Sequence, residues 1–330
     1  MTRELFDHST PSRRLNVLPD NPDKTAKGRF PKWLHRKMPT GKNLWKTQEM
    51  LDALPTVCEE AKCPNLLECW SKKTATFLAM GKECTRNCGF CDIDFNAKPV
   101  PPADDEPERI AESARKLGLK HVVITMVARD DLPDGGAAHI AKIIEAVKKE
   151  ATVEVLTSDF QGDESALEMI LQAGPHIFNH NIETVERLTP RVRHKATYAR
   201  TLQILKAAKG RTLLKSGLMV GLGEEPNEVE QTIRDLHEAG CSIITIGQYL
   251  QPSRRKLRVK AFVEPAQFDA YAAFGHQIGV RYMYSGPFVR SSYNAREAFE
   301  EIRNLREPCP NNSGIDEIAD PSKDGWDKIS

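Results

Sequence analysis

The chain has 330 residues, of which 40% are hydrophobic and 28% are charged, and its formal net charge is +1. This length allows one large α/β barrel or two smaller domains, each with a substantial buried core. The balanced composition excludes a disordered, a fibrous or a strongly nucleic-acid-binding chain.

Charge is distributed unevenly between the two ends. Residues 1–50 carry eleven Lys/Arg against five Asp/Glu, whereas residues 311–330 carry two Lys against five Asp/Glu. A basic amino-terminal arm suits an acidic partner, although a solvated and partly disordered extension has the same composition. The first twenty residues lack the apolar region of a signal peptide, and no run of about eighteen apolar residues exists. These features predict a cytoplasmic protein without a membrane partner.

Two cysteine triplets are the first chemical pattern along the chain. CEEAKCPNLLEC spans residues 58–69 and CTRNCGFC spans 84–91, so six of the eight cysteines fall within about one tenth of the sequence. In a reducing compartment, such clusters are more often metal ligands or catalytic thiols than disulfides. Each triplet is one ligand short of the four that a closed structural zinc site needs.

The second triplet has the spacing of an iron–sulfur ligand set. Cys84, Cys88 and Cys91 are spaced C-x3-C-x2-C in one short loop. Such a loop can wrap three corners of a [4Fe–4S] cube and leave the fourth iron without a protein ligand, where another molecule can bind.

From residue 74 onwards, short β-branched runs alternate with helix-like stretches. The predicted strands are 74–80, 121–126, 153–158, 176–182, 213–221 and 243–250, with a weaker run at 280–286. The predicted helices are 107–119, 137–150, 163–174, 198–210 and 227–240. Strand–helix–strand units at intervals of about thirty residues are typical of parallel βαβ folds. The pattern predicts a partial (β/α)6 barrel of the TIM type, whose sites are built at the carboxyl ends of the strands. The triplet at 84–91 follows the first predicted strand.

The motif C-x3-C-x-Φ-C, in which Phe90 is the aromatic residue, resembles the cluster motif of the radical S-adenosylmethionine (SAM) superfamily. The resemblance implies that SAM chelates the open iron and that its reductive cleavage releases a 5′-deoxyadenosyl radical. That radical takes hydrogen from unactivated carbon, which acid–base side chains cannot do, so the cofactor supplies the chemistry.

The first triplet, together with RSSY at 290–293, resembles the lipoyl synthase family within that superfamily. The likeness covers roughly residues 40–300 and includes GLMVGLGE, FNHNIE and GQYLQPS. It implies a second [4Fe–4S] cluster held by Cys58, Cys63, Cys69 and Ser292, with Ser291 as the open alternative. A serine alkoxide is a harder and more easily displaced ligand than a thiolate, which suits a cluster that is dismantled.

The implied organisation has three parts. Residues 1–70 form an extension with the auxiliary-cluster cysteines, residues 71–288 form a radical SAM partial barrel, and residues 289–330 form a carboxyl-terminal extension with RSSY. The implied reaction inserts two sulfur atoms at C6 and C8 of a protein-bound octanoyl-lysine, with the auxiliary cluster as sulfur donor. The implied partners are octanoylated lipoyl carrier domains of 2-oxoacid dehydrogenase complexes and the glycine cleavage system, a ferredoxin- or flavodoxin-type electron carrier, and an iron–sulfur carrier that rebuilds the cluster. Nucleic acid is not expected.

Weaker signals add cofactor-binding candidates. Gly135 and Gly136 follow the second predicted strand, where radical SAM enzymes often hold the methionine moiety with backbone groups, although a simple turn explains them too. Asn179, Asn181 and Glu183 alternate along a predicted strand, so they would share a face that points toward SAM while His180 faces away.

Four further residues have open or minor assignments. Arg290 would orient the serine ligand, approach the substrate amide or contact the acidic carrier. Glu224 would touch adenosine or cap the helix that begins near Pro226. Cys241 fits a buried core position and Cys309 an incidental tail thiol.

Two alternatives to this reading follow from the same cysteines. Another radical SAM sulfur-insertion enzyme would also carry a second cluster, but with ligands from inside the barrel or from a larger amino-terminal domain. A two-cluster electron carrier would need no barrel, and it would not cleave SAM.

Overall fold

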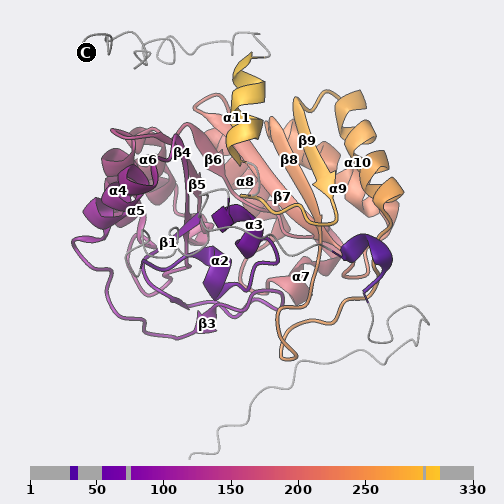
Figure 1. The fold of residues 1–330 in the computed structure, drawn as a ribbon, viewed down its shortest axis with the longest axis horizontal. Coiled ribbons are helices and arrows are strands. Elements are labelled where there is room, and N and C mark those ends of the chain that lie inside the picture. The colour runs from indigo at the N-terminus through magenta and orange to yellow at the C-terminus, as the bar shows by residue number, and fades with distance from the viewer. Residues whose placement is uncertain (1–29, 36–53, 72–75, 293–294, 305–330) are drawn as a thin grey trace, which may run out of the picture.

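A computed structural model describes residues 30–35, 54–71, 76–292 and 295–304 of the protein (Figure 1). Most of the basic amino-terminal arm, Tyr293 and Cys309 lie outside the described residues.

A curved, all-parallel sheet of seven strands forms the centre of the protein. Its order is β1-β4-β5-β6-β7-β8-β9, and every neighbouring pair is parallel. The strands are β1 (Thr76–Ala79), β4 (His121–Met126), β5 (Thr152–Leu156), β6 (Ile177–Asn179), β7 (Leu213–Val220), β8 (Ile243–Gln248) and β9 (Tyr282–Gly286). All seven predicted strands are present. Because β1 and β9 are the two ends of the sheet in the described chain, the barrel is partial, as predicted.

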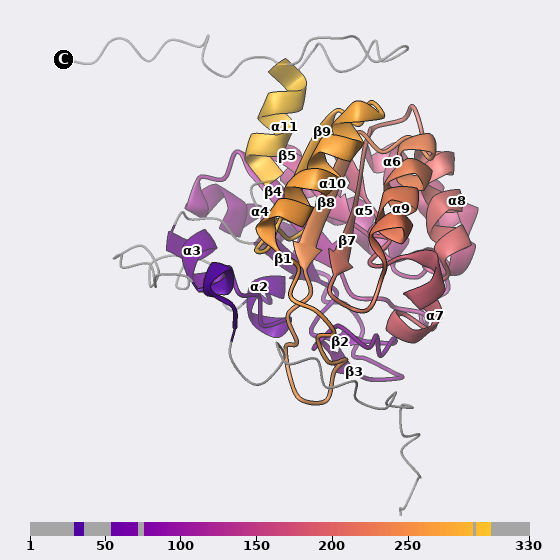
Figure 2. The ribbon, with the colours of Figure 1, turned by 90° about the vertical axis from the view of Figure 1, so that its right-hand side faces the viewer.

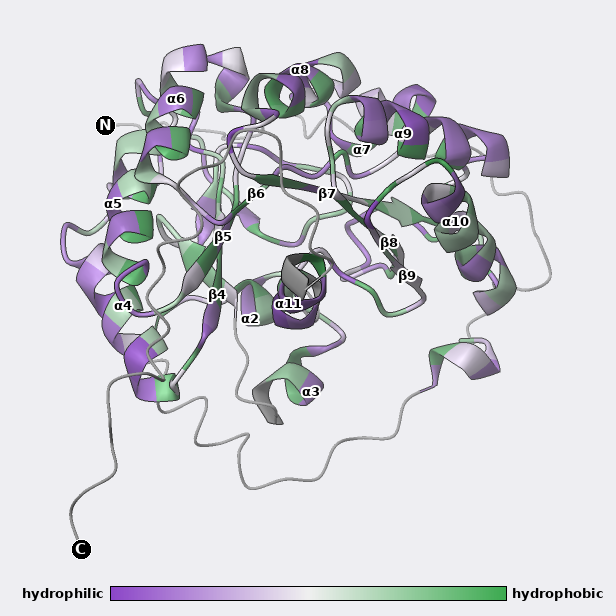
Figure 3. Ribbon diagram, turned by 90° about the horizontal axis from the view of Figure 1, so that it is seen from above, coloured by the Kyte–Doolittle hydropathy of each residue, from purple (hydrophilic) through white to green (hydrophobic). Residues whose placement is uncertain are grey.

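Helices cover the convex side of this sheet (Figure 3). They are α4 (Glu106–Leu117), α5 (Ala137–Val147), α6 (Glu164–Ala173), α7 (Thr189–Val192), α8 (Tyr198–Ala208), α9 (Pro226–Glu238) and α10 (Pro265–Gln277). The five predicted helices correspond to α4, α5, α6, α8 and α9. With α10, which the sequence reading did not identify, six strand–helix units precede β9. The short 3-10 helices are η1 (Lys32–Leu34), η2 (Phe160–Gly162) and η3 (Glu186–Leu188).

Local sequence explains why these elements begin and end where they do. Every residue of β4 and of β8 is buried, as expected for strands covered on both faces. Helix α9 begins with a capping box, in which Glu225 and Glu228 each accept from the other's backbone N–H, and Pro226 occupies the first turn. Helix α4 ends at Gly118, whose left-handed backbone closes the last turn.

The carboxyl-terminal helix α11 (Ala295–Asn304) lies on the concave side of the sheet, near the amino ends of the strands (Figures 1 and 3). Ile302 packs against Ile177 and Ile243, the first residues of β6 and β8. The ring of Phe299 lies 5.6 Å from that of His121, the first residue of β4. Helix α11 therefore closes the amino-terminal end of the barrel.

The opposite end of the barrel carries the cysteine segments (Figure 2). The first triplet lies on α2 (Val57–Glu60), α3 (Leu66–Ser71) and the turn between them, and residues of α2 contact β1. The second triplet starts in β2 (Glu83–Cys84), which pairs in parallel with β3 (Asp94–Phe95) outside the main sheet. Both triplets thus lie next to the start of the barrel.

Candidate active site

A cavity of about 520 Å³ lies at the carboxyl ends of the strands. Segments that directly follow β4, β5, β6, β8 and β9 contribute to its wall, which is where a parallel barrel is expected to build its site. Much of the lining is apolar, including Leu78, Met126, Leu156, Met219 and Tyr249. The cavity can therefore hold an aliphatic chain away from water.

Both cysteine segments face this one cavity. Cys84, Cys88 and Cys91 line it from the CTRNCGFC loop, and Cys63 lines it from the first triplet. Cys58 is buried, and Cys69 packs, partly buried, against the main hydrophobic core. Arg290, Ser291 and Ser292 line the same cavity, as does Phe90. The three predicted ligand sources therefore converge from distant parts of the sequence.

Polar contacts tie the first triplet to the other two segments. Lys62, next to Cys63, forms an ion pair with Asp92, the residue that follows Cys91. Asn65, between Cys63 and Cys69, donates from its side-chain Nδ2 to the carbonyl oxygen of Phe288 at 2.7 Å, two residues before RSSY. These contacts bring the first triplet against both the CTRNCGFC loop and the segment that carries the serines.

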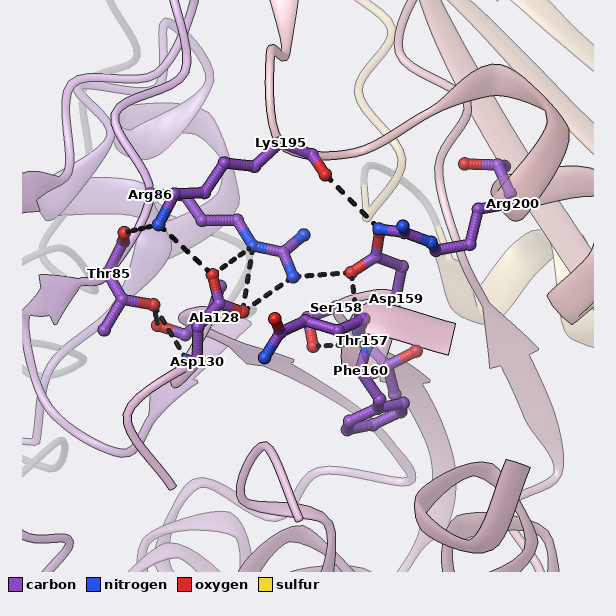
Figure 4. A network of polar contacts seen from close by, with 12 residues as sticks. Thr85, Arg86, Ala128, Asp130, Thr157, Ser158, Asp159, Phe160, Lys195 and Arg200 are labelled. Atoms are coloured by element: carbon purple, nitrogen blue, oxygen red, sulfur yellow. Dashed lines mark hydrogen bonds and ion pairs between the residues drawn. The ribbon is translucent and has the colours of Figure 1, made fainter. Parts of the chain in front are cut away.

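The CTRNCGFC loop is held at its own base by residues that follow β4 (Figure 4). The amide of Thr85 donates to the carbonyl of Ala128 at 3.0 Å, and the hydroxyl of Thr85 accepts from the amide of Asp130 at 2.9 Å. The guanidinium of Arg86 donates to both carboxylate oxygens of Asp130 and forms an ion pair with Asp159 at 2.6 Å. The loop is thereby fixed to the ends of β4 and β5.

Charge balance explains why Arg86 and Asp159 tolerate burial. Burial acts to raise the pKa of the Asp159 carboxyl, but the guanidiniums of Arg86 and Arg200 lower it to about 2. Burial likewise acts to lower the pKa of Arg86, whereas Asp130 and Asp159 raise it above its ordinary value. Both groups remain charged at neutral pH, and removing one would leave the other as an uncompensated buried charge.

The donor set and its surroundings fit iron–sulfur clusters. Burial raises the pKa of Cys58 and Cys91 to about 12 and that of Cys88 to about 11, with Arg193 partly opposing the rise at Cys88. A bare thiolate is therefore unfavourable in this cavity, and iron cations would supply the compensating charge. Among the residues that the structure describes, no three His, Cys, Asp or Glu side chains are grouped around a single ion position. A cubane does not require that grouping, because each thiolate binds a different iron.

Polar groups at one side of the cavity lack partners within the described protein. The side-chain oxygens Oδ1 of Asn181 and Oγ1 of Thr157 are buried without a hydrogen bond, and both residues line the cavity. Glu183 and Arg193 line it too; burial raises the pKa of Glu183, which Arg193 partly offsets, and lowers that of Arg193. Buried polar atoms are costly unless they are bonded, so this side of the cavity is suited to a polar, zwitterionic ligand.

The predicted alternation along FNHNIE holds for Asn181 and Glu183, which line the cavity, but not for Asn179 and His180. Asn179 does not line the cavity; its Nδ2 donates to Glu154 at 2.9 Å within the barrel. His180, which was expected to face away, does line the cavity together with Asn181 and Glu183. The reason is that β6 ends at Asn179, so the period of two no longer holds beyond it.

Gly135 and Gly136 lie at the start of α5 and are not among the residues that line the cavity within the described chain. Both have positive φ, and a Cβ at Gly136 would collide with the sulfur of Met80. Backbone conformation and packing account for these glycines, and a role in SAM binding stays a prediction.

The remaining candidates have clear positions. Glu224 does not cap α9; its carboxylate accepts from the amides of Gly221 and Leu222 in the loop after β7. Cys241 is a buried core residue, as predicted. Arg290 donates to the carbonyl of Val289 at 2.6 Å and lines the cavity, which leaves its predicted role open.

Sequence reading missed the charged residues that support the motif loop, namely Arg86, Asp130, Asp159, Lys195 and Arg200. Part of this set could have been predicted, because RDD at 129–131 and SD at 158–159 begin within three residues of the ends of the buried strands β4 and β5. Charged residues in that position are expected at the active edge of a parallel barrel. The pairing partners themselves come from separate loops and leave no local pattern.

Comparison with known proteins agrees with this geometry. The family model described as the radical SAM superfamily matches residues 78–236, and the model described as the N-terminal domain of lipoyl synthase of the radical SAM family matches residues 14–63. A lipoyl synthase of Protochlamydia amoebophila is 59% identical over 88% of this chain and 95% of its own length. One of Chlamydia trachomatis serovar D is 56% identical over 86% of this chain and 93% of its own length.

Among solved structures, SuiB of Streptococcus suis bound to S-adenosylmethionine has a similar fold, with a TM-score of 0.52 and 12% identity over 67% of this chain and 53% of that chain. SuiB bound to its precursor peptide SuiA gives a TM-score of 0.51 and 13% identity over 73% and 53%. The partial barrel with a C-x3-C-x2-C loop at the carboxyl end of its first strand defines a radical SAM enzyme. Within that superfamily, the chain belongs to the lipoyl synthase family.

Proposed function

We propose that the protein inserts two sulfur atoms, at C6 and C8, into the octanoyl chain of an octanoyl-lysine on a lipoyl carrier domain. Cys84, Cys88 and Cys91 hold the cluster that cleaves SAM. Cys58, Cys63, Cys69 and Ser292 hold an auxiliary cluster that donates the sulfur. When bound, the first cluster with SAM supplies hydrogen-atom abstraction from unactivated carbon, and the second supplies sulfide.

One observation carries this proposal: Cys63, the CTRNCGFC cysteines and the serines of RSSY line a single cavity of about 520 Å³. A carbon radical formed in this space would lie close to the sulfur source. Two-site chemistry on one acyl chain requires such proximity, because positioning converts a slow encounter into an intramolecular step.

The apolar lining of the cavity would hold the acyl chain in this mechanism. Leu78, Met126, Leu156 and Met219 surround the space between the cysteine segments. They would orient an eight-carbon chain by dispersion contacts and exclude water, which protects a reactive intermediate from side reactions. No side chain needs to remove a proton from the acyl chain.

The polar side of the cavity would receive SAM. Glu183 can pair with its ammonium group and Arg193 with its carboxylate, while the unpartnered oxygens of Asn181 and Thr157 accept from amino or hydroxyl groups. This assignment retains Asn181 and Glu183 from the sequence prediction and adds Arg193.

Charge and chemistry support the proposed setting and partners. None of the seven cysteines that the structure describes forms a disulfide, which suits the reducing cytoplasm. None of the described helices combines the length and hydrophobicity needed to cross a bilayer. The proposed partners are octanoylated carrier domains of 2-oxoacid dehydrogenase complexes and the glycine cleavage system, an electron carrier, and an iron–sulfur carrier that restores the auxiliary cluster.

Mass spectrometry of the substrate tests the proposal. An octanoylated carrier peptide is incubated under anaerobic conditions with the reconstituted protein, SAM and dithionite. A gain of two sulfur atoms per peptide is expected. A methylthio product, or SAM cleavage with no change in the peptide's mass, would assign the protein a different radical SAM activity.

A further inference from the structure

A strongly basic loop follows β8 and lies outside the cavity. Residues 254–260, RRKLRVK, include five Lys/Arg and no Asp/Glu, and we refer to them as the basic loop. The side chains of Arg254, Arg255 and Arg258 are exposed to solvent. In Figure 2 this segment belongs to the orange connection that descends beside β2 and β3.

The basic loop packs directly on the CTRNCGFC loop. The amide of Leu257 donates to the carbonyl of Gly89 at 2.9 Å. The ammonium of Lys256 donates to Asn87 at 3.0 Å and approaches the carbonyl of Cys88 at 3.4 Å. A side chain at Gly89 would collide with Leu257, so the two loops are in close contact there.

A second basic segment contacts the same cysteine loop. The amide of Gly89 donates to the carbonyl of Val192 at 2.9 Å, and Val192 lies within RVRHK at 191–195. In that segment, His194 and Lys195 are exposed. The motif loop is therefore bordered by positive charge from two separate connections of the barrel.

The CTRNCGFC loop separates the basic loop from the cavity. Cys84, Cys88 and Cys91 line the cavity, and the β8–α10 connection lines it as far as Pro252, but none of residues 254–260 does so in the described structure. A molecule bound on the basic loop is thus one loop away from the cysteines, on their outer side. It has no access there to the space in which an acyl chain reacts.

The basic loop could attract two acidic partners, an octanoylated carrier domain or an electron carrier, and its separation from the cavity favours the electron carrier. An octanoyl-lysine must enter the cavity, so its carrier needs a surface at the cavity mouth. An electron needs only to cross the short distance through the motif loop, because electron transfer through protein requires close approach and not an open path. Exposed arginines suit such an encounter, since they accelerate association with an acidic partner and allow rapid release.

We propose that the basic loop is the docking surface for a small acidic one-electron carrier protein that reduces the CTRNCGFC cluster. The inference rests on the proposed function, which consumes one electron from the carrier for each SAM cation cleaved. The products are methionine and 5′-deoxyadenosine, and the new hydrogen atom of the latter comes from the acyl chain. The carrier leaves oxidised by one electron.

The test compares two charge-matched triple variants. Arg254→Ser/Arg255→Ser/Arg258→Ser removes three exposed charges from the basic loop, and Lys142→Ser/Lys149→Ser/Lys206→Ser removes three exposed charges from the outer side of the barrel. The dissociation constant for a purified flavodoxin is measured by calorimetry at low and moderate salt. The basic-loop variant should bind about tenfold more weakly, with a reduced salt dependence, and the control variant should bind as the original protein does.

Activity assays with two reductants complete the test. In the basic-loop variant, SAM cleavage driven by reduced flavodoxin should fall while cleavage driven by dithionite is unchanged, because dithionite needs no docking surface. Unchanged flavodoxin binding would overturn the inference, as would weakened binding of an octanoylated carrier domain with flavodoxin binding intact. If dithionite produces no SAM cleavage in the original protein, the proposed function fails instead, so the two failures are distinguishable.

Discussion

At the scale of single residues, cysteines that share one cavity belong to segments with different proposed tasks. Cys88 lies in the loop that Arg86 ties to Asp130 and Asp159, whereas Cys63 lies in the segment that contacts Asp92 and Phe288 through its neighbours. Local spacing made these cysteines predictable, since three ligands of one cluster lie within a few residues of one another. Arg193, His180 and Thr157 were not predictable in the same way, because only the fold brings them to the cavity.

Alanine at these two cysteines should separate the two half-reactions. We expect Cys88→Ala to lower SAM cleavage by more than about a hundredfold, because loss of a direct cluster ligand exceeds the usual effect of its supporting groups. Cys63→Ala should still produce 5′-deoxyadenosine but no sulfur-containing peptide. Chromatography of the nucleoside and mass spectrometry of the peptide measure both. Equal loss of both products in both variants would contradict the division of labour.

The two serines of the cavity allow a matched comparison. Because a hydroxyl ligand to the auxiliary cluster is proposed at Ser292, Ser292→Ala should reduce sulfur insertion at least about tenfold while SAM cleavage persists. Ser291→Ala should retain most of the insertion. Iron content and product mass measured for both variants decide between them, and normal insertion by Ser292→Ala would transfer the role to Ser291 or abolish it.

His180 gives the protein a predicted pH dependence of stability. Burial, followed by the positive charge of Arg193, lowers the pKa of His180 from 6.5 to about 4, against the opposing effect of Asp159. In the unfolded chain His180 becomes protonated near pH 6.5, whereas in the folded chain it stays neutral until the pH is near 4. The free energy of unfolding therefore decreases as the pH falls from about 6.5 toward 4. By linkage this amounts to about 2 kcal/mol between pH 7.5 and pH 5.

Denaturant unfolding of the original chain and of His180→Gln at both pH values measures this contribution. The variant loses the hydrogen bonds to Thr157 and Thr201 at either pH, but its stability should change less between them. An identical pH difference in the two proteins would show that His180 does not titrate as described.

At the scale of secondary structure, the sequence predicted all seven strands of the sheet and five of the helices that cover it. Strands such as β4 and β8 are short, buried and rich in β-branched residues, and the helices between them have an apolar face, so both were recognisable. Helix α10, which lies between β8 and β9, was not identified, and neither was helix α11, which follows the last strand. The end of β6 at Asn179 was also missed, so the sequence did not predict that His180 lines the cavity together with Asn181 and Glu183.

Glycine substitutions test the packing at the start of α5. Gly136 has φ of 88° and would place a Cβ against Met80, whereas Gly118 has φ of 65° and nothing within 4 Å of a Cβ. Gly118→Ala should cost about 1 kcal/mol through its left-handed backbone alone. Gly136→Ala should cost about 1–3 kcal/mol more because of overpacking. Equal free energies of unfolding for the two variants would contradict this packing.

At the scale of the whole molecule, the barrel is closed at one end and equipped for chemistry at the other. Helix α11 packs on the first residues of β4, β6 and β8, while Arg290, Ser291 and Ser292, which precede it in the sequence, line the cavity at the carboxyl ends. The carboxyl-terminal extension therefore contributes residues to both the amino-terminal and the carboxyl-terminal end of the barrel. Its Ile302 packs against the first residues of β6 and β8, and its Ser292 is the proposed ligand of the auxiliary cluster. Truncation before residue 290 would therefore reduce both stability and sulfur insertion.

The central claim is that the auxiliary cluster, held across the cavity from the SAM-cleaving cluster, is itself the source of both inserted sulfur atoms. The most direct measurement is a single turnover by protein whose clusters were rebuilt with heavy-isotope sulfide, in buffer that contains only ordinary sulfide. The account predicts an octanoyl peptide that carries two heavy sulfur atoms from one protein molecule. A product with ordinary sulfur at either carbon would contradict it.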